Sequence, residues 1–250
     1  MEQASIFDYL YQPFSIENPI RLIELFAGYG SQACALRNLG ADFEHYRVVE
    51  WDKYAILSYN AIHGTDFPTM DVTKVHGEDL GIVDRERFTY LLTYSFPCTD
   101  ISVAGRMQGM AEGSGTRSSM LWQVKRILEE LQTENALPHV LLMENVTAIH
   151  SEENMPHFRK WLDFLDGLGY STFVEDLNAA DYGISQHRER TFALSILGQY
   201  NYKFPIIMDL NKDMEYYFED MTDEEALKYI VKSQKAKDLM VELNDKGELA

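Results

Sequence analysis

The chain has 250 residues, 46% of them hydrophobic, and its 40 acidic residues outnumber 22 basic ones for a net charge of −18. This length and hydrophobic content favour one α/β core. No apolar run approaches the roughly 20 residues that span a bilayer, and the N-terminus lacks the basic flank and apolar stretch of a signal peptide. We therefore expect a cytoplasmic protein that does not contact membranes.

Strand and helix patterns alternate along the chain. Apolar runs predict strands at residues 20–26, 46–49, 67–72, 88–96, 140–143, 171–177 and 191–197. Helical spacing predicts helices within 33–39, 120–131 and 158–168, and Gly40 suits the left-handed backbone just past a helix end. Such alternation predicts a doubly wound, mainly parallel sheet with helices on both faces, whose ligands bind at the carboxyl ends of the strands.

The first predicted strand ends in a glycine loop, Phe26-Ala27-Gly28-Tyr29-Gly30, and a helix follows it. Glycines at this place let the backbone approach a ligand, although an ordinary tight turn is the alternative interpretation. Glu50 lies twenty residues past Gly30, at the end of the next predicted strand, from which an acid accepts both hydroxyls of a ribose.

Two further residues suit an adenine. Trp51 could cover one face of the base, with a plain core aromatic as its alternative, and Asp71 could accept from the exocyclic amine. The chain has no GxxxxGK[ST] and no full GxGxxG, which are typical of triphosphate and pyrophosphate binding. A nucleoside cofactor without phosphate groups fits these residues better, and S-adenosylmethionine is the commonest cofactor of that kind.

Polar motifs follow three other predicted strands: Ser95-Phe96-Pro97-Cys98, Glu144-Asn145-Val146 and Gln186-His187-Arg188-Glu189-Arg190. A thiol, a carboxylate and paired guanidiniums at one sheet edge would attack a planar, electron-poor ring while holding its polar edge. The structural alternatives are an inert buried thiol for Cys98, a helix-starting acid for Glu144 and surface charges for Arg188 and Arg190. Cys34, on an apolar helical stripe, is interpreted as a core residue. The seven histidines share no ligand spacing, so we expect no metal site.

The motifs FAGYGSQ, EWDKYA, MDVTKV, SFPCTDIS, LLMENV and AADYGISQHRER occur in the order and approximate spacing of the C5-cytosine DNA methyltransferases. Over about residues 20–198 the chain closely resembles bacterial and phage members of that family, including those of restriction-modification systems. The resemblance implies the Rossmann-like fold of S-adenosylmethionine-dependent methyltransferases and double-stranded DNA as the partner.

The resemblance also implies roles for individual residues. Cys98 would add to C6 of a flipped-out cytosine, Glu144 would hydrogen-bond N3 and the amine, Arg190 would hold O2, and Arg188 would brace the site. Ten residues would form the S-adenosylmethionine site: Phe26, Gly28, Tyr29, Gly30, Ser31, Glu50, Trp51, Asp71, Val72 and Pro97. Separately from the resemblance, the glycines and few large apolar residues between Thr99 and Arg117 indicate a lid, with Ser102, Arg106 and Gln108 contacting DNA and a surface loop without this role as the alternative.

We expect three regions: an N-terminal extension (1–19), a catalytic and cofactor-binding domain (20–198), and an acidic C-terminal segment (199–250). Family members usually continue into a target-recognition domain and a closing core helix, whereas residues 199–250 resemble only the start of such a region. A capping box at Thr222 predicts a helix there that runs through Val231. We therefore expect weak cofactor affinity and little sequence-specific methylation from the chain alone. It would be either one half of a split enzyme, with a second chain as partner, or the product of a truncated phage gene.

The net charge argues against a polyanionic partner, because phosphate-binding proteins normally present a basic face. The acidic residues crowd the C-terminal segment, however, and four arginines lie beside the polar motifs: Arg106, Arg117, Arg188 and Arg190. Two alternative functions stay open. One is a tRNA cytosine-5 methyltransferase, although its Cys-Phe-Thr marker is absent from the sequence. The other is a noncatalytic S-adenosylmethionine-binding or partner subunit.

Overall fold

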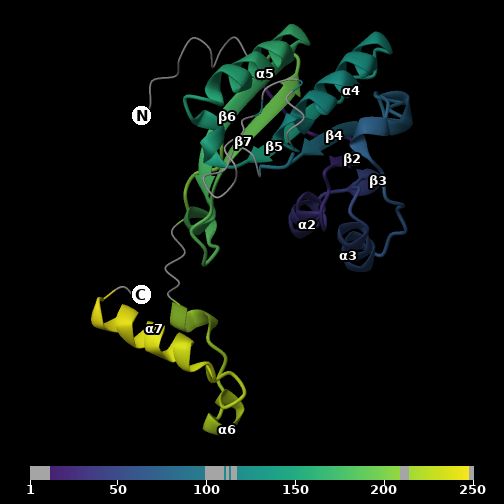
Figure 1. Cartoon of the computed structure of the whole chain (residues 1–250). Helices are drawn as coiled ribbons and strands as arrows, with labels where there is room; N and C mark the ends of the chain where they lie inside the picture. Colours follow the sequence, from purple (N-terminus) through teal and green to yellow (C-terminus); the bar gives the residue numbers. More distant parts are fainter. Residues whose placement is uncertain (1–11, 99–109, 111–112, 114–116, 209–213, 248–250) are drawn as a thin grey trace. The chain divides into compact units, whose positions relative to one another are not determined.

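The computed structural model describes residues 12–98, 110, 113, 117–208 and 214–247 (Figure 1). The chain forms two compact units, Met1–Asp209 and Leu210–Ala250.

A six-stranded sheet lies at the centre of the first unit, with the strand order β3-β2-β4-β5-β7-β6. Its strands are β2 (Ile20–Leu25), β3 (Phe43–Val49), β4 (Thr89–Tyr94), β5 (Val140–Asn145), β6 (Tyr170–Asn178) and β7 (Glu189–Leu197). The neighbours β3, β2, β4 and β5 pair in parallel, and β7 runs antiparallel to both β5 and β6. The predicted mainly parallel α/β sheet is confirmed. Two short strands, β1 (Gln12–Pro13) and β8 (Tyr200–Asn201), pair in parallel beside it.

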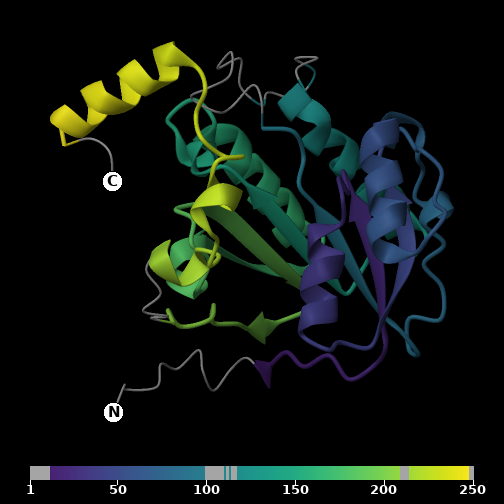
Figure 2. The ribbon, with the colours of Figure 1, turned by 90° about the horizontal axis from the view of Figure 1, so that it is seen from below.

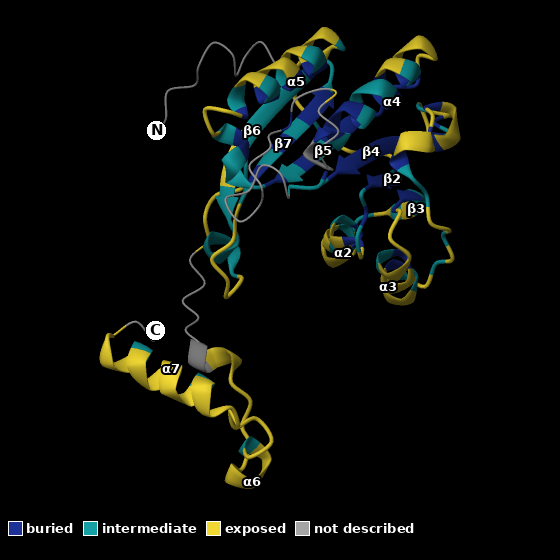
Figure 3. Ribbon diagram, in the orientation of Figure 1, coloured by how far each residue is buried: buried dark blue, intermediate teal, exposed yellow. Residues whose placement is uncertain are grey.

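Helices cover both faces of this sheet (Figures 1 and 2). One face carries α2 (Ser31–Asn38) and α3 (Lys53–His63), and the other carries α4 (Leu121–Thr133) and α5 (Met155–Gly167). The side chains of β2 alternate between them: Ile23 and Leu25 join the core under α4 and α5, whereas Leu22 packs with Ala33 of α2. Figure 3 shows the central strands buried and the outer helix faces exposed.

The helix ends follow sequence signals only in part. Gly40 adopts a left-handed φ of 68° just past α2, as predicted. Helix α3 was not predicted, although Asp52 caps it by accepting from the backbone N–H groups of Tyr54 and Ala55 at 2.8 and 2.9 Å. Cys34 is only half-buried, at 3.4 Å from a donor nitrogen of Arg37, so its interpretation as a core residue was wrong.

The predicted strand at 67–72 is also wrong. This stretch has no strand and leads into the 3₁₀ turn η1 (Val72–Lys74), one of several short 3₁₀ turns that also include η2 (Glu78–Leu80) and η4 (Thr147–His150). The Asp71 side chain accepts from the Thr73 N–H at 3.0 Å and caps this turn. A capping side chain bonded to its own local backbone favours a turn over a sheet ladder.

The second unit contains α6 (Asp223–Ala226) and α7 (Gln234–Asp245). Thr222 and Glu225 form the predicted capping box at the start of α6, but this helix ends at Ala226 instead of Val231. Among the described residues of this unit whose side chains are placed, none is buried.

Glu24, near the end of β2, is a carboxyl group inside the core. It is 1% exposed, and the Tyr59 hydroxyl donates to its Oε2 at 2.5 Å. Burial disfavours the charged carboxylate and raises the pKa of Glu24 to about 7, against the hydrogen bond from Tyr59, which favours the charged form.

This raised pKa predicts a pH dependence of folding. In the folded chain Glu24 keeps a proton that the unfolded chain releases, so its contribution to stability is complete below pH 4.5 and is lost as the pH rises through about 7. The difference in unfolding free energy between wild type and Glu24→Gln should therefore shift against wild type by about 3 kcal/mol over this range. Urea denaturation at several pH values measures it. A pH-independent difference would contradict the account, and Glu17→Gln, at an exposed residue, serves as control.

Candidate active site

The predicted polar motifs lie at one edge of the sheet. Glu24 and Leu25 end β2, Val49 ends β3, Tyr94 ends β4, and Asn145 ends β5. Since β7 runs in the opposite direction, its first residues lie at this same edge, where Thr191 pairs with Asn145. The reversed strand therefore brings the Gln-His-Arg-Glu-Arg motif to the carboxyl ends of the parallel strands.

A cavity of about 490 Å³ opens at this edge. Six of the predicted cofactor residues line it: Phe26, Glu50, Trp51, Asp71, Val72 and Pro97. The sequence reasoning missed five further lining residues: Val49, Met70, Thr73, Ser95 and Met120. Three of these directly adjoin predicted site residues along the chain, so the motifs themselves could have indicated them, whereas Met120 comes from the segment before α4 and carried no signal.

Glu50 is the buried acid of this cavity, with 8% of its surface exposed. Its Oε2 accepts from the Gly28 N–H and its Oε1 from the Asp52 N–H, both at 2.9 Å. A carboxylate has about four acceptor positions, so two backbone donors leave capacity for two more. This arrangement fits a ligand that offers a pair of hydroxyl groups.

The glycine loop connects β2 to α2 through left-handed backbone. Phe26, Gly28 and Gly30 have φ values of 58°, 56° and 82°. A bulky residue such as Phe26 rarely takes this conformation, and such outliers concentrate at functional sites. A Cβ added to Gly28 would meet nothing within 4 Å. Gly28, Tyr29, Gly30 and Ser31 do not themselves line the cavity, and Tyr29 and Ser31 are largely exposed.

The two residues predicted to recognise an adenine both face this cavity. Trp51 is 75% exposed, which excludes the alternative of a core aromatic. The hydroxyl and the N–H of Thr73 donate to Asp71, and these bonds lower the pKa of that carboxyl. Asp71 therefore stays an ionised hydrogen-bond acceptor at neutral pH.

The thiol segment lies beside the cavity. Pro97 lines the cavity, and Cys98 follows it, half-buried against the main core. Asn145, which is 2% exposed, donates from Nδ2 to the Phe96 carbonyl at 3.1 Å and accepts the Val146 N–H at 2.9 Å. This side chain ties the Glu-Asn-Val motif to the segment that carries Cys98.

Glu144 and Arg190 form an ion pair across β5 and β7. Arg190 Nε lies 3.0 Å from Glu144 Oε1, and both side chains are about one-quarter exposed. Nη1 of Arg190 also donates to the Glu189 carbonyl at 2.7 Å. The carboxylate and the guanidinium are thus held together, with further acceptor and donor positions for a ligand.

Arg188 is positioned differently. Its backbone N–H donates to Asn178 Oδ1 at 3.0 Å, and the residue is exposed to solvent. The predicted lid at 99–117, including Ser102, Arg106 and Gln108, falls mostly outside the described residues. Within that segment Met110 is buried, and its carbonyl accepts from Trp122 Nε1 at 2.8 Å.

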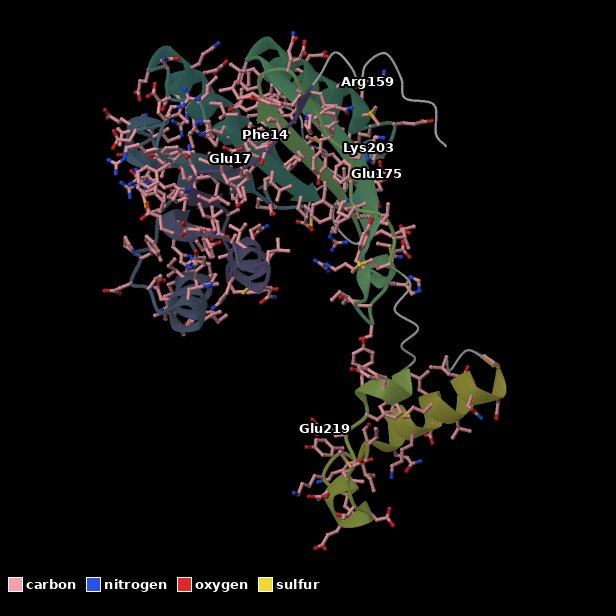
Figure 4. The ribbon with its side chains drawn as sticks, turned by 180° about the vertical axis from the view of Figure 1, so that it is seen from behind. Phe14, Glu17, Arg159, Glu175, Lys203 and Glu219 are labelled. Atoms are coloured by element: carbon pink, nitrogen blue, oxygen red, sulfur yellow. The ribbon has the colours of Figure 1, made fainter. Side chains whose placement is uncertain are left out.

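A second hollow, of about 620 Å³, lies along β6 and the segment 202–207. Glu175 and Lys203, both labelled in Figure 4, are among its lining residues. It contains none of the predicted site residues. In the described ranges there is no cluster of three or more metal-ligating side chains, and no helix there is long and apolar enough to span a membrane.

The sequence of this chain matches a known protein family and several of its members. The family described as "C-5 cytosine-specific DNA methylase" matches residues 20–247, so the match extends beyond residue 198 into the acidic segment. Orphan methyltransferase M.SssI of Spiroplasma monobiae is 33% identical over 72% of this chain and 60% of its own length. Type II methyltransferase M2.ScrFI of Lactococcus lactis subsp. cremoris is 32% identical over 88% of this chain and 72% of its own length.

Among solved structures, a DNMT2 variant from Spodoptera frugiperda superposes with a TM-score of 0.60 at 21% identity, covering 82% of this chain and 61% of that one. At that identity the likeness establishes the fold alone. The chain thus spans about three-fifths to three-quarters of the length of these proteins. The family match over residues 20–247 and the identity to these relatives show that the chain belongs to the C5-cytosine-specific DNA methylase family, beside bacterial and phage type II and orphan methyltransferases.

Proposed function

We propose that this chain transfers a methyl group from S-adenosylmethionine to C5 of a cytosine flipped out of double-stranded DNA. One observation carries the proposal: Pro97 lines the cavity of Glu50, and the next residue is the thiol of Cys98. A nucleoside site and a nucleophile are therefore adjacent, as methyl transfer to an activated ring requires.

The cavity residues fit the cofactor by chemistry. Glu50 would accept the two ribose hydroxyls with its remaining acceptor positions. Asp71 would accept from the adenine amine, and the exposed face of Trp51 would stack on the base. The glycine loop would approach the methionine part through its backbone, where Gly28 leaves open space. When bound, S-adenosylmethionine supplies an electrophilic methyl group.

Cys98 would activate the cytosine. Its thiolate forms an S–C6 bond, and the displaced ring electrons make C5 nucleophilic. In its protonated form Glu144 would hold N3 and the amine and would give its proton to N3 as the ring gains charge. C5 then takes up the methyl group and loses its proton to water. The S–C6 bond breaks to release the Cys98 thiolate, and the N3 proton returns to Glu144 as the aromatic ring is restored. Arg190 would hold O2, and Arg188 would brace the base or its adduct.

Double-stranded DNA is the proposed substrate in spite of the net charge of −18. Arg190 at this sheet edge is paired with Glu144 and would meet the base, whereas the exposed Arg188 would be available to phosphates. Rotating a base out of the stack costs a few kcal/mol, which contacts in the closed complex must offset.

We also propose a second polypeptide, which carries a recognition region, as a partner. One observation supports it: the C-terminal unit has exposed apolar residues, including Tyr229 and Val241, which a partner could cover. Adding such a chain should increase sequence-specific methylation. Equal activity without it would contradict this part of the proposal.

The nucleophile is tested by trapping. In a duplex in which every cytosine is 5-fluorocytosine, fluorine replaces the proton that must leave C5, so the adduct persists and no target sequence has to be known. With S-adenosylmethionine present, wild type and Cys34→Ser should form a covalent complex that survives denaturing electrophoresis. Cys98→Ser should lose the complex entirely.

The other functions are separate outcomes of this experiment. Trapping on 5-fluorocytosine tRNA but not on the duplex would favour an RNA methyltransferase. S-adenosylhomocysteine binding without trapping on either substrate would favour a noncatalytic subunit. If Cys98→Ser forms as much covalent complex as wild type, Cys98 is not the nucleophile.

Glu50→Gln tests the cofactor site. The amide presents an NH₂ group where one carboxylate oxygen now accepts a backbone N–H, so a donor faces a donor and an acceptor for the ribose is lost. Titration calorimetry with S-adenosylhomocysteine should show affinity weakened by about tenfold or more. Glu17→Gln, an exposed control labelled in Figure 4, should bind like wild type. Unchanged binding by Glu50→Gln would remove Glu50 from the site.

A further inference from the structure

A buried polar network lies under the glycine loop and has no role in the reaction described above. Tyr59 of α3 is fully buried, and its hydroxyl lies 2.5 Å from Glu24 Oε2 and 2.6 Å from His45 Nδ1. When Glu24 is ionised, Tyr59 donates its one proton to that carboxylate. His45 must then carry a proton on Nδ1 and donate to the Tyr59 oxygen. The hydroxyl therefore links β2, β3 and α3.

The same network reaches the loop backbone through His63. Its Nε2 lies 2.9 Å from the Tyr29 carbonyl, and its Nδ1 lies 3.1 Å from Nη2 of Arg37. Since a carbonyl only accepts and a guanidinium only donates, His63 is the neutral tautomer with its proton on Nε2. The rings of His63 and Tyr59 pack with centroids 4.4 Å apart. The carbonyl of the loop is thus held by a ring that Tyr59 supports.

Gly30 shows how closely the loop lies on these rings. A Cβ at this residue would sit 2.6 Å from Cε2 of Tyr59 and would also overlap His63. Two residues earlier, the Gly28 N–H donates to Glu50 in the cavity. The loop is therefore fixed on the cavity side by Glu50 and on the opposite side by Tyr59 and His63.

We propose that Glu24, Tyr59 and His63 are positioning residues for the cofactor: they act through the Tyr29 carbonyl and the backbone of Gly30 to hold the glycine loop in its binding conformation. The inference rests on the proposed cofactor site and extends it to residues that do not line the cavity. Losing the network frees the loop to move, so binding must then include the cost of ordering it.

A pair of substitutions on α3 tests this inference. Tyr59→Phe removes the hydroxyl at the centre of the network, while Tyr54→Phe makes the same chemical change on the same helix at a residue that is 69% exposed. Titration with S-adenosylhomocysteine should show affinity about tenfold weaker for Tyr59→Phe and unchanged for Tyr54→Phe. Glu24→Gln should weaken binding too, and the double variant should lose less than the two single effects combined.

His63 provides a variant at a half-buried residue, where folding is less at risk. His63→Gln keeps an N–H donor in reach of the Tyr29 carbonyl, whereas His63→Leu removes it. We expect His63→Gln to retain wild-type affinity and His63→Leu to lose about tenfold, with KM for the cofactor raised and kcat at saturation unchanged. A merely structural role would affect both variants alike.

The outcomes separate the two proposals. If wild type does not bind S-adenosylhomocysteine, the proposed cofactor site fails. If wild type binds it and both Tyr59→Phe and His63→Leu bind equally well, the positioning role fails while the cofactor site stands.

Discussion

The parallel pairing of β2, β3, β4 and β5 decides which residues of this chain can meet. It delivers the glycine loop, Glu50, the Cys98 segment and Glu144 to one edge, and the reversed strand β7 adds Arg190 to the same edge. One side chain then sets the local spacing: Asn145, buried at the end of β5, hydrogen-bonds the Phe96 carbonyl. Because both groups are buried, losing this bond would leave an unpaired carbonyl, and the thiol segment would lose its link to Glu144.

The acidic side chains at this edge differ in the groups that donate hydrogen bonds to them. Glu50 accepts two backbone N–H groups, Glu144 pairs with Arg190, and Glu24 accepts from Tyr59 deeper in the fold. These differences suit different tasks: accepting hydroxyls, working beside a guanidinium, and supporting a loop from below. The net charge of −18 does not by itself exclude the proposed polyanionic substrate, since the charge of the whole chain says little about one edge of its sheet.

Much of this arrangement is legible in the sequence, because apolar runs and polar motifs at their ends are local signals. Helix α3 was not predicted because only Ile56 and Tyr59 along it are buried. Exposed apolar residues such as Leu57 obscure the helical spacing of its buried face. The apolar residues at 67–72 have the pattern of a strand, but the Asp71 side chain accepts from the Thr73 N–H and caps a turn there. The link from Asn145 to Phe96 and the network of Glu24 join residues far apart in the chain. No single sequence pattern marks them.

The central claim is that the thiol and the carboxylate converge on one base beside the nucleoside cavity. The most direct measurement is a crystal structure of the chain trapped on 5-fluorocytosine DNA with S-adenosylhomocysteine bound. The account predicts a bond from Cys98 Sγ to C6, Glu144 within hydrogen-bonding distance of N3, and the ribose hydroxyls on Glu50. A base lying away from Cys98, or a cofactor bound outside the cavity of Glu50 and Trp51, would contradict it.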